Sequence, residues 1–506
     1  MAEKIYQQIC SISKKAALYK SIENLLEWDL NTSMPEKGIA LKTTQSILLQ
    51  EQYHLIMTSK KYKHLLSQLI DIESGSILSH ELSPQQMHCI QALHKDYLYN
   101  KKLPNAFRKE YKETQNEMMP VWQEAKKRGS FSLFLPLFRK IIQLAQKQVH
   151  FLGYKEHPYD ALLDIYEPNL TVSHLDPIFN QLSKMSASII KIAQENQNPS
   201  VQDLFTNMSF PISQQKALCQ CVLQALHLPH ESYHFAESYH PLCIGIGPHD
   251  VRLTTHYHED NFLKAFFSTI HETGHALYES NLPKEHFGTP LGEPASFSIH
   301  ESQSRFYETF LGHSRPFLQA FWPTMQELFP DIKKISFNDL YHSINFIQPN
   351  PIRIYADELT YNLHIILRYN IEKALIEGSL QPEEVPRVWK EQMQQLLHIT
   401  PKNESEGSLQ DIHWALGYFG YFPSYTLGNI YAGTLFQTFA QETPQWQEEV
   451  LQKNFHHVNL YLHQTIHKYG REYPPHELIC KATKKRLSLD LYIQYLTEKY
   501  GGKCTN

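Results

Sequence analysis

Residues 262–277 read Phe-Leu-Lys-Ala-Phe-Phe-Ser-Thr-Ile-His-Glu-Thr-Gly-His-Ala-Leu, and this stretch decides the fold around it. Its apolar residues recur at the spacing of one helix face, so we predict a largely buried helix. His271 and His275 are four residues apart, which places both rings on one face, where they can bind a single metal ion. Glu272 is displaced by one position and can reach a water at the open fourth position of such a site. Gly274 leaves room for close approach by a neighbouring helix or a substrate.

The His-Glu-x-x-His pattern, known from zinc peptidases, is short, and the chain contains 29 histidines. A chance match is therefore a real alternative, in which the motif is only a polar stripe on a surface helix. The apolar flanks on both sides of the motif argue against a surface helix and favour a metal site.

A catalytic zinc site needs a third protein ligand and keeps one position for water. We predict Glu301 as that ligand, because two histidines and a glutamate form a known hydrolytic zinc set. A second helix that starts near Pro294 would carry Glu301 back toward the first. His300 is the rival candidate, since only one of two adjacent helical residues can face the metal. A salt bridge with Arg305, one turn later, is the other interpretation of Glu301.

Composition predicts a globular protein with no membrane span. With 506 residues, of which 42% are hydrophobic, we expect one domain with two helical lobes, residues 1–240 covering a cleft and residues 241–506 carrying the metal and substrate sites. No apolar run has transmembrane length, and the first residues lack a signal-peptide pattern. Seven cysteines without C-x-x-C pairs indicate reduced thiols and a cytoplasmic location. The net charge of −5 argues against a nucleic-acid partner.

The rest of the chain reads as mostly helical, because glycines are few and alternating patterns are rare. Residues 1–130 read as polar helices that would cover one side of a cleft. One hairpin is predicted, with strands at 243–246 and 251–257 around a Gly-Pro-His-Asp turn. An edge strand there could pair with an extended peptide, and a purely structural hairpin is an equally good interpretation.

A candidate for binding the end of a peptide follows the metal motif. Asn350-Pro351 predicts the start of a helix that runs to Gly378, with Arg353 in its first turn. The Arg353 guanidinium would offer a bidentate fork to a carboxylate. Asp357, one turn later, would share its face and orient it, or the two would form an ordinary surface ion pair.

Residues 407–425 form a segment unusually dense in glycine and aromatic residues. Within it, His413 and Tyr425 are both able to donate a hydrogen bond to a developing oxyanion. Taken singly, each is more simply interpreted as a buried hydrogen-bonding residue.

Taken together, these motifs resemble those of the carboxypeptidase Taq family of metallopeptidases over nearly the whole chain. The matching stretches, in order, are Trp28-Asp29 with Thr32, Met34 and Pro35; residues 158–168; Asp250-x-Arg252-x-Thr254; His271 to His275; Glu301 within His-Glu-Ser-Gln; Ile352-Arg353-x-x-Ala356-Asp357; and Gly407-x-x-Gln410-Asp411-x-His413-Trp414. One departure is His240-Pro241-Leu242, where the family has His-Pro-Phe, so we infer no side-chain preference.

The resemblance implies a mainly α-helical fold like those of neurolysin and angiotensin-converting enzyme, with a long central groove and a small β-hairpin or sheet beside the active site. It also implies a metallocarboxypeptidase that releases single residues from peptides with a free C-terminus. One zinc or cobalt ion per chain and a homodimer are further implications of the family.

The expected site has metal ligands His271, His275 and Glu301, the general base Glu272, the carboxylate-binding Arg353, and the oxyanion donors His413 and Tyr425. Two alternatives remain open. One is an oligopeptidase or dipeptidyl carboxypeptidase on the same scaffold, and the other is a catalytically silent peptide- or metal-binding protein.

Overall fold

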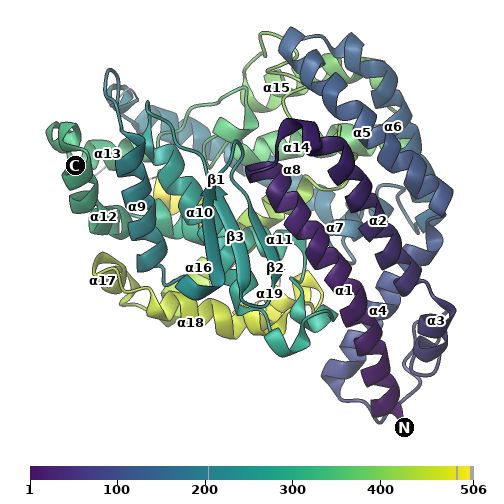
Figure 1. Cartoon of the computed structure of the whole chain (residues 1–506). Helices are drawn as coiled ribbons and strands as arrows, with labels where there is room; N and C mark the ends of the chain where they lie inside the picture. The colour runs from purple at the N-terminus through teal and green to yellow at the C-terminus, as the bar shows by residue number, and fades with distance from the viewer. Residues whose placement is uncertain (203, 486–487, 502–506) are drawn as a thin grey trace. The chain divides into compact units, whose positions relative to one another are not determined.

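The computed structural model describes residues 1–202, 204–485 and 488–501. These residues form two compact units, each assembled from separate parts of the chain. The first unit comprises 1–101, 204–341 and 435–485, and the second comprises 102–202, 342–434 and 488–501. Both units are built almost entirely of helices, which confirms the predicted mainly α-helical class (Figure 1). The lobe boundary expected near residue 240 stays a prediction.

Elements of the first unit are α1 (Ala2–Thr32), η1 (Glu36–Gly38), α2 (Ile39–Met57), α3 (Lys60–Leu66), α4 (Pro84–Lys102), α9 (Ile212–Ala225), η3 (His230–Ser232), β1 (Tyr233–Glu237), β2 (Cys243–Gly247), β3 (Asp250–Thr255), α10 (Phe262–Asn281), η4 (Lys284–His286), η5 (Pro290–Gly292), α11 (Phe297–Arg305), η6 (Phe306–Gly312), α12 (Arg315–Leu328), η7 (Pro330–Lys334), α17 (Trp446–Leu451), α18 (His456–Thr465), η10 (His467–Tyr469) and α19 (Pro475–Thr483). Elements of the second unit are α5 (Asn105–Arg128), α6 (Phe131–Leu152), α7 (Asp160–Tyr166), α8 (Val172–Asn196), η2 (Pro199–Val201), η8 (Arg353–Tyr355), α14 (Tyr361–Glu377), η9 (Pro382–Glu384), α15 (Val385–Leu397) and α20 (Asp490–Tyr500). Two further helices, α13 (Phe337–Ile344) and α16 (Pro423–Glu442), have residues in both units, and the last residue of α4, Lys102, also belongs to the second unit.

The sheet of the first unit has three strands in the order β1-β3-β2. Strands β2 and β3 pair antiparallel across a turn, so the predicted hairpin is confirmed, although β3 ends at Thr255 rather than Tyr257. Strand β1 pairs parallel with β3, with Tyr233 opposite Val251, and was not predicted. Strand β2 is thus an edge strand, but its Gly245 carbonyl already accepts a hydrogen bond from another part of the unit.

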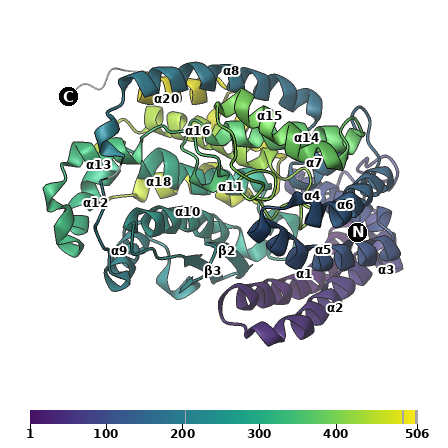
Figure 2. The same ribbon diagram turned by 90° about the horizontal axis from the view of Figure 1, so that it is seen from above.

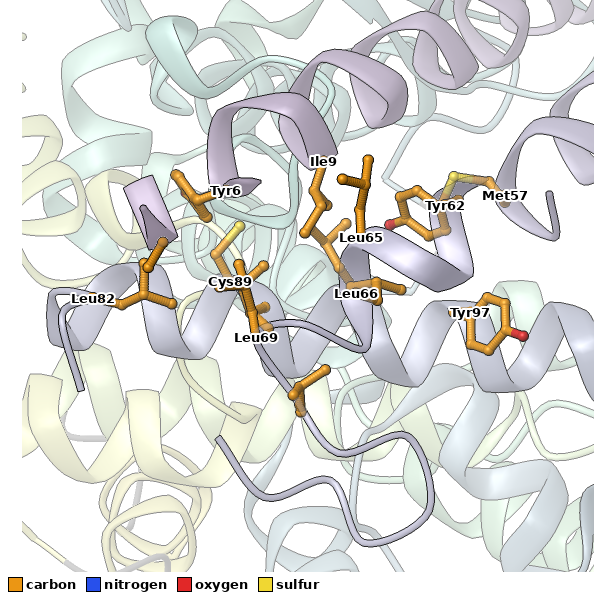
Figure 3. Packing of buried hydrophobic residues seen from close by; sticks show 14 of the residues in the cluster. Tyr6, Ile9, Met57, Tyr62, Leu65, Leu66, Leu69, Leu82, Cys89 and Tyr97 are labelled. Carbon is orange, nitrogen blue, oxygen red and sulfur yellow. The ribbon is translucent and has the colours of Figure 1, made fainter. Parts of the chain in front are cut away.

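Helix α1 supplies that hydrogen bond, because its Asn24 Nδ2 donates to the Gly245 carbonyl at 2.9 Å. In both views α1 lies between the sheet and α2 (Figures 1 and 2). The N-terminal helices also enclose an apolar core. Side chains of α1, α3 and α4, including Ile9, Leu66 and Cys89, are fully buried there, and Figure 3 shows this packing. In the described residues, no helix combines the length and the apolar content needed to cross a membrane.

One predicted helix is wrong at its start. The sequence suggested a continuous helix from Pro351 to Gly378, but residues 353–355 form a single 3₁₀ turn and Ala356 is extended. The α-helix begins only at Tyr361, and it ends as predicted, with Gly378 in the left-handed conformation at φ 87°. Asp357 causes the break, because its carboxylate accepts the backbone N–H groups of Leu359 and Thr360 instead of lying in a helix interior.

Candidate active site

Helix α10 presents the His-Glu-x-x-His motif as predicted. Its first turn is capped by Asn261, whose side chain accepts the backbone N–H of Leu263. The apolar residues around the motif are buried, so the interpretation as a surface helix is wrong. His271 and His275 stand on one face, with ring centroids 4.9 Å apart.

Helix α11 crosses close to α10 at Gly274. A Cβ atom at this position would lie 2.7 Å from both the Gln303 carbonyl oxygen and the Ser304 Cα. The missing side chain therefore makes room for a neighbouring helix, which is one of the two interpretations left open by the sequence. Ser296 caps α11 by accepting the N–H of Ile299, and the helix then carries Glu301 on its buried side.

The three predicted metal ligands converge. Glu301 Oε2 lies 3.7 Å from His271 Nε2 and 3.5 Å from His275 Nε2. One ligand atom from each residue lies within 4.8 Å of the other two. Two imidazole nitrogens and one carboxylate oxygen are the donor set of hydrolytic zinc sites, so these residues fit a divalent transition metal.

Glu301 also forms the salt bridge that was considered as its alternative role. Arg305 Nε donates to Glu301 Oε1 at 2.7 Å, which leaves Oε2 directed at the two histidines. Arg305 Nη1 also donates to Glu308 Oε2 at 3.2 Å. Both roles of Glu301 are therefore compatible, because each uses a different carboxylate oxygen.

Glu308, which the sequence analysis missed, lies in the π-helical segment η6 and fixes the first histidine. Its Oε2 is 2.8 Å from His271 Nδ1, an arrangement that directs His271 Nε2 toward Glu301. Burial disfavours the His271 cation, but Glu308 and Glu301 outweigh burial and raise the pKa of His271 to about 9. A bound metal ion must therefore displace this proton. In the sequence, the position of Glu308 two helical turns after Glu301 was the signal that could have identified it.

His275 is held differently. Its Nδ1 is buried and has no hydrogen-bond partner among the residues that the structure describes. Its ring instead stacks on His300, with centroids 4.3 Å apart and planes inclined by 19°. His300 Nε2 lies 2.9 Å from Glu279 Oε1, so His300, the rival ligand, is already engaged by another carboxylate.

Glu272 is buried beside these groups. Burial raises the pKa of the Glu272 carboxyl to about 7, although the neighbouring His271 favours its charged form. A carboxyl with a pKa near neutrality can both accept and return a proton at physiological pH.

Arg353 belongs to the second unit. Its guanidinium pairs with the carboxylate of Asp411, a partner that the sequence did not predict. Its Nε donates to Asp411 Oδ1 at 2.9 Å, and its Nη1 donates to the Tyr361 hydroxyl at 2.8 Å. Asp357 is not its partner, because that carboxylate caps the following turn. The prediction that Asp357 orients Arg353 is therefore wrong.

Asp411 serves two arginines at once. Its Oδ2 accepts from Arg368 Nε at 2.6 Å while its Oδ1 accepts from Arg353. Burial alone would raise the pKa of Asp411, but the two guanidinium groups hold it far below the usual range. This cluster thus contains two positive charges and one negative charge. Asp411 was already part of a recognised motif, whereas only the fold reveals Arg368 as its second partner.

His413 and Tyr425 lie beside Arg353. The Tyr425 ring centroid is 5.1 Å from the Arg353 guanidinium carbon, and His413 Nε2 lies 3.1 Å from the Tyr425 hydroxyl. Burial and the charge of Arg353 lower the pKa of His413 to about 3, so the ring is neutral at physiological pH. The predicted site residues therefore form two groups, the metal ligands with Glu272 in the first unit and Arg353, His413 and Tyr425 in the second.

Known proteins match the chain over almost its full length. The carboxypeptidase Taq (M32) metallopeptidase family model matches residues 8–500. Carboxypeptidase 1 of Bacillus subtilis is 36% identical over 496 residues, covering 98% of this chain and 97% of its own. Thermostable carboxypeptidase 1 of Thermus thermophilus is 33% identical over 509 residues, covering 98% of each chain.

Solved structures of carboxypeptidases also resemble this chain over nearly its full length. Metallocarboxypeptidase 1 of Trypanosoma cruzi has a TM-score of 0.93 at 31% identity, covering 99% of this chain and 100% of its own. A carboxypeptidase of Pyrococcus furiosus has a TM-score of 0.92 at 31% identity, covering 98% of this chain and 99% of its own. The chain therefore belongs to the carboxypeptidase Taq (M32) family of metallopeptidases.

Proposed function

We propose that this metallocarboxypeptidase releases single residues from peptide C-termini, with His271, His275 and Glu301 holding one divalent metal ion. The convergence of two Nε2 atoms on Glu301 Oε2 is the observation that carries this proposal. We propose zinc, with cobalt as the alternative, because imidazole nitrogen and carboxylate oxygen suit both ions. When bound, such an ion polarises a peptide carbonyl and lowers the pKa of water.

Glu272 acts as the general base in this proposal. Its carboxylate takes the proton from the water that attacks the last peptide carbonyl and then delivers the proton to the leaving amine. Its burial and its pKa of about 7 support this role, because both protonation states are accessible near neutral pH.

Arg353 binds the free carboxylate of the substrate and so selects the last peptide bond. Because Asp411 neutralises only one of its two arginine partners, the cluster keeps a surplus positive charge for an anion. Arg353 is 7% exposed, and a charge-assisted hydrogen bond is stronger in such a dry environment.

The oxyanion that develops during attack receives hydrogen bonds from Tyr425 or His413. His413 Nδ1 is buried and has no hydrogen-bond partner within the described part of the chain, while Nε2 faces the Tyr425 hydroxyl. A neutral imidazole and a phenol are both able to donate one hydrogen bond, which supports this assignment.

The remaining parts of the proposal concern the whole molecule. We infer that the chain is one metallocarboxypeptidase domain, because the family model spans residues 8–500. The odd number of cysteines, without paired motifs, supports a cytoplasmic location. Family resemblance supports a homodimer.

Mass spectrometry of the products from a ladder of free-acid peptides, with added zinc or cobalt, tests this function. We expect successive loss of single C-terminal residues and little cleavage of the same peptides after C-terminal amidation. Release of dipeptides, or equal cleavage of amidated peptides, would instead identify a dipeptidyl carboxypeptidase or an oligopeptidase. Metal analysis of the purified protein checks the ion independently of activity.

A further inference from the structure

Arg305 is the last residue of α11, one turn after Glu301, and it binds two carboxylates of the candidate metal centre. Its Nε donates to Glu301 Oε1 at 2.7 Å, and its Nη1 donates to Glu308 Oε2 at 3.2 Å. The same oxygen of Glu308 lies 2.8 Å from His271 Nδ1. One guanidinium therefore contacts one proposed metal ligand directly and reaches a second ligand through Glu308.

The two oxygens of the Glu301 carboxylate have different surroundings. Oε2 lies 3.7 Å from His271 Nε2 and 3.5 Å from His275 Nε2, and Ser304 Oγ lies 3.1 Å from the same oxygen. Oε1 accepts the hydrogen bond from Arg305 instead. The carboxylate is thus oriented with one oxygen toward the two histidines and the other toward a permanent cation.

This orientation needs a restraint from outside the side chain. The torsion about the last bond of a glutamate has broad minima, so the side chain alone does not fix where its two oxygens point. A carboxylate that turns freely can bind a metal ion through one oxygen or through both. Arg305 supplies the restraint, because turning Oε1 toward the histidines would break a charge-assisted hydrogen bond to the buried Glu301.

The number of carboxylate oxygens decides which ions such a centre suits. Two imidazole nitrogens, one carboxylate oxygen and one open position match zinc and cobalt. A second oxygen from Glu301 would compete for the open position, which the proposed reaction needs for water. It would also make the donor set richer in oxygen, which suits manganese and calcium better.

We propose that Arg305 is a positioning residue that keeps Glu301 a one-oxygen ligand and so sets the coordination number and the ion preference of the metal centre. This inference rests on the proposed function, because it requires that His271, His275 and Glu301 hold the ion. Arg305 acts on the ion only through the orientation of Glu301.

The affinities of Arg305→Met for zinc and manganese, measured by competition with a chelator, test this role. Methionine removes the charge and the hydrogen bonds but fills much of the same space. We expect the manganese affinity relative to the zinc affinity to rise about ten- to a hundredfold, the range typical of residues that orient metal ligands. Because both ions are divalent, the loss of a nearby positive charge changes both affinities alike and cancels in the ratio. Arg315→Met, at an arginine of α12 that donates to Asn338, is the matched control and should leave the ratio unchanged.

The visible absorption of the cobalt-loaded protein reports the coordination number independently of activity. Cobalt(II) absorbs much more strongly in four-coordinate sites than in six-coordinate sites, because the centre of symmetry of an octahedral site forbids these transitions. We expect an intense spectrum for the parent and a clearly weaker one for Arg305→Met. A weak, six-coordinate spectrum of the parent would overturn the inference without any variant.

Two further variants separate the contact with Glu301 from the contact with Glu308. Glu308→Gln removes the ion pair with Arg305 but keeps an oxygen that can accept from His271 Nδ1, so the affinity ratio should stay near that of the parent. A shift as large as that of Arg305→Met would trace the effect to His271 and overturn the role of Glu301. Arg305→Lys keeps a charged donor without the directed fork and should bring the ratio part of the way back to the parent value.

The outcomes distinguish this inference from the proposed function. An unchanged affinity ratio and an unchanged cobalt spectrum in Arg305→Met would overturn the role of Arg305, whereas the peptide ladder tests the proposed function on the parent. A parent that binds neither zinc nor cobalt would overturn the metal centre and this inference with it. Circular dichroism checks that the variants are folded. If Arg305→Met does not fold, the parent spectrum and Arg305→Lys provide the test.

Discussion

The metal-ligand cluster and the Arg353 cluster are both buried and charged, but they are built in opposite ways. His271, His275 and Glu301 come from two neighbouring helices, and one capped helix fixes the spacing of the two histidines. Arg353 sits in a short 3₁₀ turn, and its carboxylate partner Asp411 lies in an irregular segment 58 positions away. Helical periodicity therefore predicts the first cluster, whereas long-range contacts build the second.

The two clusters also differ in their charge. The first groups the carboxyl groups of Glu272, Glu301 and Glu308 with one permanent cation, Arg305. Once a metal ion displaces the proton of His271, whose pKa is about 9, the cluster lacks positive charge. The second has two arginines and one aspartate and thus lacks negative charge. Buried charge is costly unless it is compensated, so the first cluster favours a cation and the second an anion.

The strongest test of the first cluster is Glu272→Gln. Glutamine keeps the size of the side chain but cannot accept the proton, so we expect the turnover number to fall by about two to four orders of magnitude. Metal content should stay close to that of the parent, because Glu272 is not a proposed ligand. Steady-state kinetics together with metal analysis measure both quantities. Full activity in a fully metallated Glu272→Gln protein would rule out its role as base.

The next test separates Glu301 from its neighbour His300. Glu301→Ala removes a proposed ligand, so we expect metal affinity to fall more than the ten- to hundredfold typical of residues that only orient ligands. His300→Ala removes the ring that stacks on His275 and should stay within that smaller range. Competition with a chelator measures both affinities.

His300→Phe is the control for stacking. It keeps an aromatic ring against His275 but loses the contact with Glu279, so its metal affinity should lie between those of the parent and His300→Ala. If His300→Ala empties the site and Glu301→Ala does not, the third ligand is His300.

The geometry of the first cluster could be predicted because its causes are local. The motif spacing, the apolar flanks and the small Gly274 all lie within one helix, and each matches the structure. Glu308 could not be predicted with the same ease, because a π-helical segment alters the normal spacing at its position. Strand β1 was missed because it pairs parallel with a strand further along the chain, so no hairpin turn marks it in the sequence.

Arg353→Ala tests the second cluster with a smaller expected effect. A hydrogen-bonded pair between charged groups is worth about 1.5–3 kcal/mol, so catalytic efficiency on free-acid peptides should fall about ten- to a hundredfold. Amidated peptides should be affected much less. Asp411 keeps its contact with Arg368 in this variant, which limits damage to the fold.

The informative quantity is the ratio of free-acid to amidated cleavage. Arg353→Lys should restore it only in part, because lysine supplies a charge without a bidentate fork. Arg387→Ala, at an exposed arginine of the same unit that pairs within its own helix, is the control and should leave the ratio unchanged. A ratio that also stays constant in Arg353→Ala would place the carboxylate elsewhere, with Arg252 the next residue to test.

The second cluster was only partly predictable. Arg353, His413 and Tyr425 could be named from their chemistry. The partners of Arg353 could not, because only the fold brings Asp411 and Tyr361 to Arg353 and brings Arg368 to Asp411. The helix start was misplaced because Asn350-Pro351 is a strong start signal, whereas Asp357 competes for the backbone with its own hydrogen bonds.

The smallest expected effect concerns Glu372, a fully buried carboxyl of α14 that fixes the irregular segment of the second cluster. Its Oε1 accepts from Trp414 Nε1 at 2.8 Å, and its Oε2 accepts from the Tyr159 hydroxyl at 2.6 Å and the Gly420 N–H at 2.8 Å. Burial raises the pKa of Glu372 from 4.5 to about 7, against the opposing effect of these hydrogen bonds.

This shift makes the free energy of unfolding depend on pH. Between pH 4.5 and about 7 the folded protein retains a proton that the unfolded chain has lost, so this contribution to stability falls as pH rises through that window. Glu372→Gln has no such titration. The melting temperature of the parent, relative to the variant, should therefore decrease by roughly a few degrees from the lower to the upper end of the window.

Tryptophan fluorescence during thermal unfolding, recorded at several pH values, measures this difference. Glu377→Gln on the same helix is the matched control, because the Ser379 hydrogen bond lowers the pKa of Glu377 and moves its titration below the window. Parallel pH profiles for the parent and Glu372→Gln would mean that Glu372 is ionised throughout. Its charge would then offset that of Arg368, and the surplus positive charge that distinguishes the second cluster from the first would be lost.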